Sequence, residues 1–429
     1  MKKAIKILIN LARLLLGAVF VFSGFVKAID PLGTSYKIKD YLEAFDWTSI
    51  SDLSLMMAVL LAATEFFLGA ALLLGIWKKT VSLLLLLFMS VVTPLTLYLA
   101  IKNPVTDCGC FGDALVLTNW QTFSKNLLLL LLAIVVFLKN DTFYLFFGLR
   151  TSRYNTYWCI IFPLFLSLFS YRHLPVMDFR PYKIGNRLED FMKIPAGAPT
   201  DSFEIHFIYK KNGVKKEFSA NNAPLSDSSW TFVDRKEEQI RKGYIPPIHD
   251  FVIVHPSKGD ITEEILKDTS YTFLLVSPKL EESNRDVAPL IDFACNYANS
   301  HNYTFYGLTN SGKSDFDEWN YEYDSNIEFC SVDDRVLKTI IRSNPGLVLL
   351  KDGVVIQKWA FRDIPDFSKV KLPLNDLKWG KLKPANTFLI IEKYAILFLI
   401  PVLLFYLIHK GYCFHYKLRN KRKTKSEKV

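Results

Sequence analysis

The sequence predicts a mixed fold class, in which an α-helical transmembrane bundle is joined to a soluble α/β region. Half of the 429 residues are hydrophobic, and the mean hydropathy is positive, at +0.17. Apolar stretches of about 20 residues, the length that crosses a bilayer, fill much of residues 7–171 and return at 387–408. The long stretch between them has ordinary soluble composition. These observations indicate an integral membrane protein with a large domain outside the bilayer.

Six segments are expected to cross the membrane. The first follows a lysine-rich start, and a membrane span is favoured over a signal peptide because no convincing small-residue cleavage site follows it. The first four segments form a four-helix core, the fifth is the shortest, and the sixth precedes a basic tail. The six segments are 7–28, 53–77, 81–101, 123–138, 157–171 and 387–408.

Lysine and arginine residues gather on one side of these segments, and the positive-inside rule makes that side the cytoplasm. They are Lys2, Lys3, Lys6, Lys78, Lys79, Lys139, Arg150, Arg153, Lys417, Arg419, Lys421, Arg422, Lys423 and Lys425. We therefore expect a multi-pass inner-membrane protein, with both termini cytoplasmic and residues from about 175 to 384 in the periplasm. Much of the net charge of +10 lies in the C-terminal tail, after an apolar segment, and this position is typical of a cytoplasmic anchor. Nucleic acid is therefore not an expected partner.

Two cysteines, Cys108 and Cys110, lie one residue apart between the third and fourth segments. A disulfide between them would close a very small ring, and strained disulfides are the more oxidising ones. Gly109 can adopt the unusual φ angle that so tight a turn needs. The pattern leaves two interpretations open: a candidate redox pair at the membrane surface, or two inert thiols in a turn.

Glu65 lies near the middle of the second segment, where a charged carboxylate costs roughly 2.5–3.5 kcal/mol. It should face the interior of the bundle and either be protonated or contact a cation. Arg13 and Lys27, one near each end of the first segment, are the candidate cations. A structural contact between helices and a proton or quinone site both remain open. The histidines are too sparse for a metal site.

The outer region begins with an alternating segment at 203–209 and a hairpin turn at 211–213. Strands are expected at 271–276, 303–308 and 346–350, with helices at 286–300 and 334–342. This order resembles the thioredoxin fold, and the resemblance implies a cis peptide bond before Pro345. Thioredoxins carry two cysteines after the first central strand, where this chain has Ser277-Pro278-Lys279-Leu280. The resemblance therefore implies the fold without thioredoxin-type catalysis.

Cys295 and Cys330 also lie in this outer region. Buried small residues are the first interpretation of both, and a disulfide between them remains open. Cys159 and Cys413 are expected at the cytoplasmic side, where disulfides do not belong.

The first segment, with Gly17, Gly24 and Lys27, and the second, with Glu65 and Gly69, resemble the helices of the DoxX-like four-helix membrane family. Cys108-Gly109-Cys110-Phe111-Gly112 resembles the cysteine motif of its MauE branch. The resemblance implies a role in the maturation of disulfide-rich proteins. The expected domains are a DoxX/MauE-like membrane region (1–140), a fifth segment with its loop (141–175), a small β-containing region (176–265), a thioredoxin-like domain (266–380), a last membrane helix (385–410) and a basic tail (411–429).

The sequence thus predicts a role in thiol–disulfide or redox homeostasis of the envelope. Cys108 and Cys110 would react with a periplasmic protein client, one attacking and the other resolving. No soluble cofactor is evident, so a membrane quinone is the expected electron acceptor. Two alternatives stay open, namely a non-catalytic membrane anchor that binds a partner and a subunit of a respiratory complex.

Overall fold

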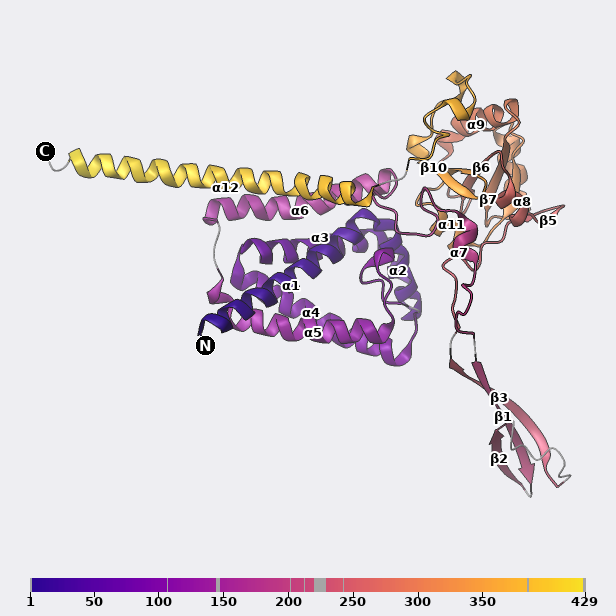
Figure 1. Cartoon of the computed structure of the whole chain (residues 1–429), viewed down its shortest axis with the longest axis horizontal. Helices are drawn as coiled ribbons and strands as arrows, with labels where there is room; N and C mark the ends of the chain where they lie inside the picture. Colours follow the sequence, from indigo (N-terminus) through magenta and orange to yellow (C-terminus); the bar gives the residue numbers. More distant parts are fainter. Residues whose placement is uncertain are drawn as a thin grey trace.

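The structure is a computed structural model that describes residues 2–105, 107–143, 147–200, 202–211, 213–219, 229–241, 243–383 and 386–426. It contains a helical N-terminal region, a seven-stranded sheet covered by helices, and a separate three-stranded sheet (Figure 1). The expectation of apolar helices followed by an α/β region is confirmed.

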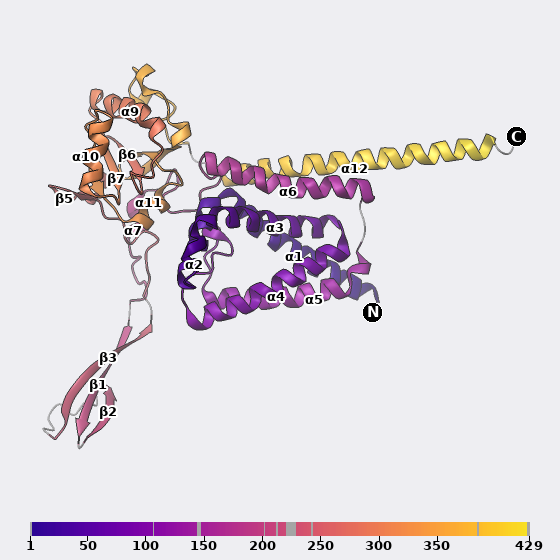
Figure 2. The same ribbon diagram turned by 180° about the vertical axis from the view of Figure 1, so that it is seen from behind.

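The helical bundle comprises α1 (Lys2–Ile29), α2 (Pro31–Ala44), α3 (Ser54–Leu74), α4 (Lys78–Lys102) and α5 (Asn119–Leu138). α1 and α3 pack closely because glycines let their backbones approach each other. A Cβ atom on Gly24 would lie 2.3 Å from Phe66 N, and one on Gly69 would lie 2.5 Å from Val21 N. The short helix α2 lies across the end of the bundle that faces the α/β region (Figure 2).

Two further helices, α6 (Leu149–Arg172) and α12 (Thr387–Ser426), run side by side along the bundle (Figures 1 and 2). Trp158 Nε1 of α6 donates a hydrogen bond of 3.0 Å to Phe398 O of α12. Among the described residues, five helical stretches are long and apolar enough to cross a membrane: Lys3–Ile29, Thr48–Leu74, Lys78–Lys102, Asn119–Leu138 and Thr387–Tyr412. α6, which holds the expected fifth span, is not one of them, because polar residues and Arg150 and Arg153 fill its first half.

The seven-stranded sheet has the order β10-β9-β6-β7-β8-β4-β5. Its centre is parallel, and β9 runs antiparallel to β6 and β10 antiparallel to β9. The strands are β4 (Val254–His255), β5 (Gly259–Asp260), β6 (Tyr271–Ser277), β7 (Thr304–Thr309), β8 (Glu328–Ser331), β9 (Gly346–Lys351) and β10 (Val354–Ala360). The peptide bond between Asn344 and Pro345, just before β9, is cis, as the sequence analysis expected.

Helices cover both faces of this sheet, which explains why every residue of β6 is buried. One core packs α9 (Ala288–Ser300) and α10 (Lys313–Glu322) against one face, and the other packs α7 (Leu188–Met192), α8 (Thr262–Lys267) and α11 (Asp334–Ile340) against the opposite face. Alternate residues of β6, such as Phe273 and Leu274, belong to opposite cores. We call this sheet with its helices the α/β region.

The three-stranded sheet projects away from the α/β region (Figure 1). It consists of β1 (Ser202–Lys211), β2 (Val214–Ser219) and β3 (Thr231–Arg241), in the order β2-β1-β3. All its neighbouring strands are antiparallel. The hairpin expected around 211–213 joins β1 to β2, although Asn212 of its turn lies outside the described residues.

Candidate functional site

The two cysteines that the sequence singles out lie in a tight turn between α4 and α5. We call residues 107–113 the cysteine loop. Gly109 has a φ angle of +63°, a conformation that favours glycine, and its N–H donates to Asp107 Oδ1 at 3.0 Å. The N–H of Gly112 donates to the carbonyl of Gly109 at 3.0 Å. These bonds close the turn and bring the two cysteine side chains to the same place.

The Sγ atoms of Cys108 and Cys110 lie 2.9 Å apart, as two half-buried thiols. The pKa of Cys110 is lowered, because the hydrogen bond between the two thiols stabilises its thiolate and because Lys125 and Lys27 are near; these effects outweigh burial. The pKa of Cys108 is raised by the same hydrogen bond and by burial. Since the thiolate is the reactive form of cysteine, the geometry favours Cys110 as the nucleophile at neutral pH.

Lys125 supplies part of the positive charge near Cys110. It lies in the second turn of α5, half-buried, with Nζ 4.1 Å from the centre of the Phe111 ring. Sequence reasoning missed this residue. The available signal was a single lysine near the start of an otherwise apolar segment, where a charge is costly and is therefore often functional.

Beneath the cysteine loop, Lys27 and Glu65 form a buried ion pair, with Lys27 Nζ 2.7 Å from Glu65 Oε2. Lys27 also donates to Ser23 Oγ at 2.7 Å, and Ser23 Oγ lies 2.7 Å from Glu65 Oε2. Ser23 and Lys27 both lie within hydrogen-bond reach of the Cys110 carbonyl oxygen. The ion pair therefore holds the loop at its second cysteine, as well as neutralising the charge of Glu65.

Arg13, the other candidate cation, is not part of this cluster. Its Nε and Nη2 donate to the carbonyl oxygens of Leu72 and Leu73, each at 2.8 Å. These carbonyls belong to the last turn of α3, where helices leave such groups without intrahelical partners. Arg13 therefore caps α3 far along the bundle from the cysteine loop.

The helix α2 holds the other side of the cysteine loop. Lys37 Nζ lies 2.6 Å from Asp107 Oδ2, and the Tyr41 hydroxyl donates to the Cys108 carbonyl at 2.8 Å. Sequence reasoning missed α2 as well. The signal for it was Asp30 followed by Pro31, because aspartate is a favoured N-cap and proline a favoured first residue of a helix; Asp30 does cap α2.

A cavity of about 40 Å³ lies between Cys110 and the centre of the bundle. Its polar wall includes Ser23, Glu65 and Lys125. Apolar side chains complete it: Val19, Phe20, Phe88, Met89, Val92, Phe111 and Leu129. This volume has room for ordered water next to several polar partners.

Helices α1 to α5 and the cysteine loop together correspond to one family match. Residues 5–139 match the family described as methylamine utilisation protein MauE. The match covers the cysteine loop and the Lys27–Glu65 pair, and it supports a multi-pass membrane protein. Residues 203–242, a range that includes β2, β3 and nearly all of β1, match a domain of unknown function, DUF8463. No curated protein and no solved structure matches the chain.

Among the side chains that the structure describes, the cysteines outside the MauE-matching region do not come together as a second thiol pair. Cys295 and Cys330 are buried free thiols in the cores on opposite faces of the sheet. Burial raises their pKa values, to about 11 and about 12 respectively. Cys159 is buried in α6, and the side chain of Cys413 lies outside the described residues. The part of the chain that the structure describes also holds no cluster of His, Cys, Asp or Glu suited to a metal ion.

Changing Lys125 to Gln is expected to raise the pKa of Cys110, because a nearby positive charge that favours the thiolate is lost. Alkylation of Cys110 at pH values well below its pKa should slow by roughly threefold, which corresponds to about half a pKa unit. The measurement is the rate of iodoacetamide labelling against pH in the Cys108→Ser background and in the intact pair. Lys125→Arg should keep the wild-type profile, and so should Lys102→Gln at the exposed end of α4. A pKa that stays constant in Lys125→Gln would contradict this role.

Proposed function

We propose that the protein exchanges disulfides with client proteins outside the cytoplasmic membrane through Cys108 and Cys110. The observation that carries the proposal is the 2.9 Å approach of the two Sγ atoms, and the lowered pKa of Cys110 supports it. The match of residues 5–139 to the MauE family supports a membrane setting. The cysteine loop also joins two apolar helices that are long enough to cross a membrane, α4 and α5, which supports a position at a membrane surface.

In the reducing direction, the Cys110 thiolate attacks one sulfur of a client disulfide. A mixed disulfide forms and the second client sulfur leaves as a thiolate. Cys108 then gives up its proton to a client thiolate and attacks Cys110 Sγ, so that the Cys108–Cys110 disulfide forms and the client sulfur held in the mixed disulfide leaves as a thiolate. Two electrons have passed to the client. The reverse sequence oxidises a client dithiol, and a membrane quinone that accepts two electrons and two protons would then reoxidise the pair.

The location of the site is part of the proposal. The arrangement of the elements supports it, since the start of α1 and the end of α12 lie at the end of the bundle away from the α/β region (Figure 1). With the lysine- and arginine-rich tail in the cytoplasm, the cysteine loop and the α/β region would face the periplasm. We further propose that the α/β region is thioredoxin-like and binds the client polypeptide, on the support of the parallel strands at its centre and the helices on both faces of its sheet.

Thiol trapping tests this proposal directly. Intact cells would be treated with a membrane-impermeant maleimide of high mass, before and after reduction, and the shift of the protein on a gel would be followed. We expect Cys108 and Cys110 to be protected in part of the population before reduction and labelled after it, because the pair cycles between disulfide and dithiol. Labelling that is complete without reduction at every growth stage would argue against redox cycling. Labelling only after lysis would argue against the orientation.

One observation favours a second candidate, a membrane anchor that binds a partner without catalysis. The end of β6, where thioredoxins carry their cysteines, has Ser277 donating to Asn344 Oδ1 at 2.7 Å instead. Under this alternative the two loop cysteines would stay reduced in the trapping experiment.

A further inference from the structure

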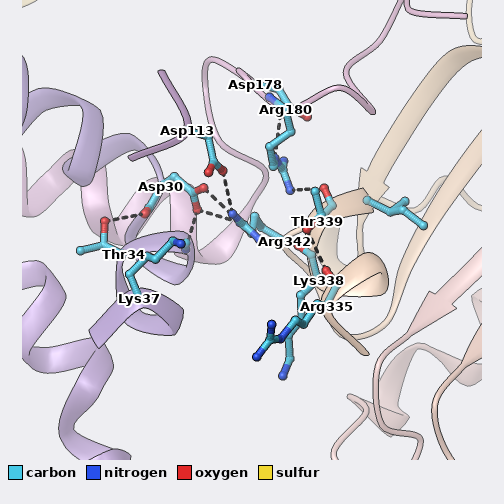
Figure 3. Close-up of polar contacts among 12 residues, drawn as sticks. Asp30, Thr34, Lys37, Asp113, Asp178, Arg180, Arg335, Lys338, Thr339 and Arg342 are labelled. Carbon is cyan, nitrogen blue, oxygen red and sulfur yellow. Dashed lines mark hydrogen bonds and ion pairs between the residues drawn. The ribbon is translucent and has the colours of Figure 1, made fainter. Parts of the chain in front are cut away.

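Arg342 joins the α/β region to the cysteine loop. It lies in the segment between α11 and β9, and its side chain is only 7% exposed. Figure 3 shows it reaching across to two carboxylates of the membrane region, Asp30 and Asp113. Its Nε lies 3.1 Å and 3.0 Å from the two oxygens of Asp30, and its Nη2 lies 3.0 Å from Asp113 Oδ2.

Both carboxylates have a structural position in the membrane region. Asp30 is the N-cap of α2, where Oδ1 accepts the N–H of Gly33 at 2.9 Å. Asp113 ends the cysteine loop. One guanidinium therefore ties the start of α2, which contacts the loop through Lys37, to the far end of the loop itself. The fork of donors on arginine is suited to such a double contact, which lysine cannot reproduce.

The segment that carries Arg342 is itself fixed by two other buried cations. Arg180 Nη1 donates to the Thr339 carbonyl at 3.0 Å, and Lys358 Nζ donates to the Ile340 carbonyl. Asp178 neutralises both cations, at 2.8 Å from Arg180 and 3.0 Å from Lys358. The backbone just before Arg342 is therefore held in place by buried contacts within the α/β region. Because Arg342 contacts Asp113, the position of the α/β region determines the position of the cysteine loop.

This support lies at the edge of the sheet where ligands usually bind in α/β folds. Gly346, the first residue of β9, pairs with Val276 near the end of β6. The carboxyl ends of parallel strands β6 and β7 thus share an edge with residues 343–346, and sites in open α/β sheets lie outside such an edge. The end of β6 carries no cysteine in this chain, but Arg342 attaches the cysteine loop close by.

We propose that Arg342 is a positioning residue, through which the α/β region holds the cysteine loop and keeps the two thiols in hydrogen-bond contact. The two regions then form one composite site, with thiols from the helical bundle and a client-binding edge from the sheet. The idea of a composite site rests on the disulfide exchange proposed above. The positioning of the two thiols by Arg342 through Asp113 does not depend on that proposal.

The test measures the pKa of Cys110 in the full-length protein, from the pH dependence of its alkylation, in Asp113→Asn. This isosteric change removes the negative charge at the loop end of the clamp, which weakens the contact of Arg342 with the loop, and it keeps the Arg342–Asp30 contact. We expect the pKa to rise by about one unit, a tenfold slower reaction at low pH, because a loosened loop populates the Cys108–Cys110 hydrogen bond less. The direction of the change distinguishes the two effects. Loss of the negative charge of Asp113 would by itself lower the pKa of Cys110, so a rise in this pKa indicates that the loop has loosened.

Arg342→Lys keeps the charge but not the double contact, and it should raise the pKa in the same way. Asp52→Asn, which removes an exposed carboxylate of the membrane region, is the matched control and should leave the pKa unchanged. A pKa that stays constant or falls in both Asp113→Asn and Arg342→Lys would overturn the proposal. If the wild-type pair never cycles but both variants raise the pKa, the proposed function fails and the positioning role stands. If the pair cycles and neither variant changes the pKa, the proposed function stands and the positioning role of Arg342 fails.

Discussion

Changing either Cys108 or Cys110 to serine is expected to abolish disulfide exchange, with losses on the order of 10²-fold or more, and the double variant should be no worse than either single variant. Residues that act as one unit have strongly non-additive effects. Without Cys108, the mixed disulfide on Cys110 cannot be resolved and accumulates; without Cys110, the thiol with the lowered pKa is missing. The measurements are complementation of a deletion strain and the trapping of mixed disulfides.

Cys413→Ser, a change of the same type in the helix α12, is the control and should complement fully. The two single variants should also differ, because Cys108→Ser should trap a client through Cys110 and Cys110→Ser should trap much less. A double variant that complements as well as the wild type would show that the turn is structural. The partner-binding anchor would then be the better explanation of the fold.

Changing Lys27 to Met is expected to destabilise the helical bundle by about 3–5 kcal/mol, because it leaves the charge of Glu65 buried and without its cation. Lys27 and Glu65 are only 4% and 7% exposed, so solvent cannot replace the lost partner. The apparent melting temperature of the purified protein in detergent should fall, and the yield from membranes should fall with it. Alkylation of Cys110 should change as well, since Lys27 also contacts its carbonyl oxygen.

Adding Glu65→Gln to Lys27→Met should recover most of the lost stability, because the amide carries no charge and still reaches Ser23. Lys102→Met, a lysine-to-methionine change at an exposed position of α4, controls for the loss of a lysine from the protein. If the two changes at positions 27 and 65 lowered the melting temperature additively, the side chains would not be acting as a pair. A double-mutant cycle measures this coupling directly.

Long, strongly apolar segments were predictable because local composition decides them. α1, α4 and α5 each contain an expected segment, α3 covers most of the expected 53–77, and the central strands β6, β7 and β9 lie where strands were expected. Other elements differ from the expectation, among them α2 and α12, because their signal is weak or misleading. α2 has few apolar residues to reveal it, and α12 continues to Ser426, beyond the expected 408, because lysine and arginine favour helix even after the apolar run ends.

The candidate site divides in the same way. The sequence identified the thiol pair and the need of Glu65 for a cation, because a short cysteine spacing and a carboxylate within an apolar run are visible locally. It offered Arg13 and Lys27 as equal partners, and the choice depends on which end of α1 packs beside Glu65. Only the tertiary structure shows that Lys27 pairs with Glu65 and that Arg13 instead donates to carbonyl oxygens at the end of α3.

The sequence by itself determined that this is a membrane protein with a thiol pair in a turn and an α/β region beyond it, because hydrophobic length, turn chemistry and strand patterns are local properties. The tertiary structure alone decided that Lys125 lies near Cys110, that α2 supports the loop, and that Arg342 contacts both Asp30 and Asp113. These contacts join residues far apart in the chain, in the last case 312 and 229 positions apart. Such pairings follow from the packing of whole helices and sheets, which no local pattern records.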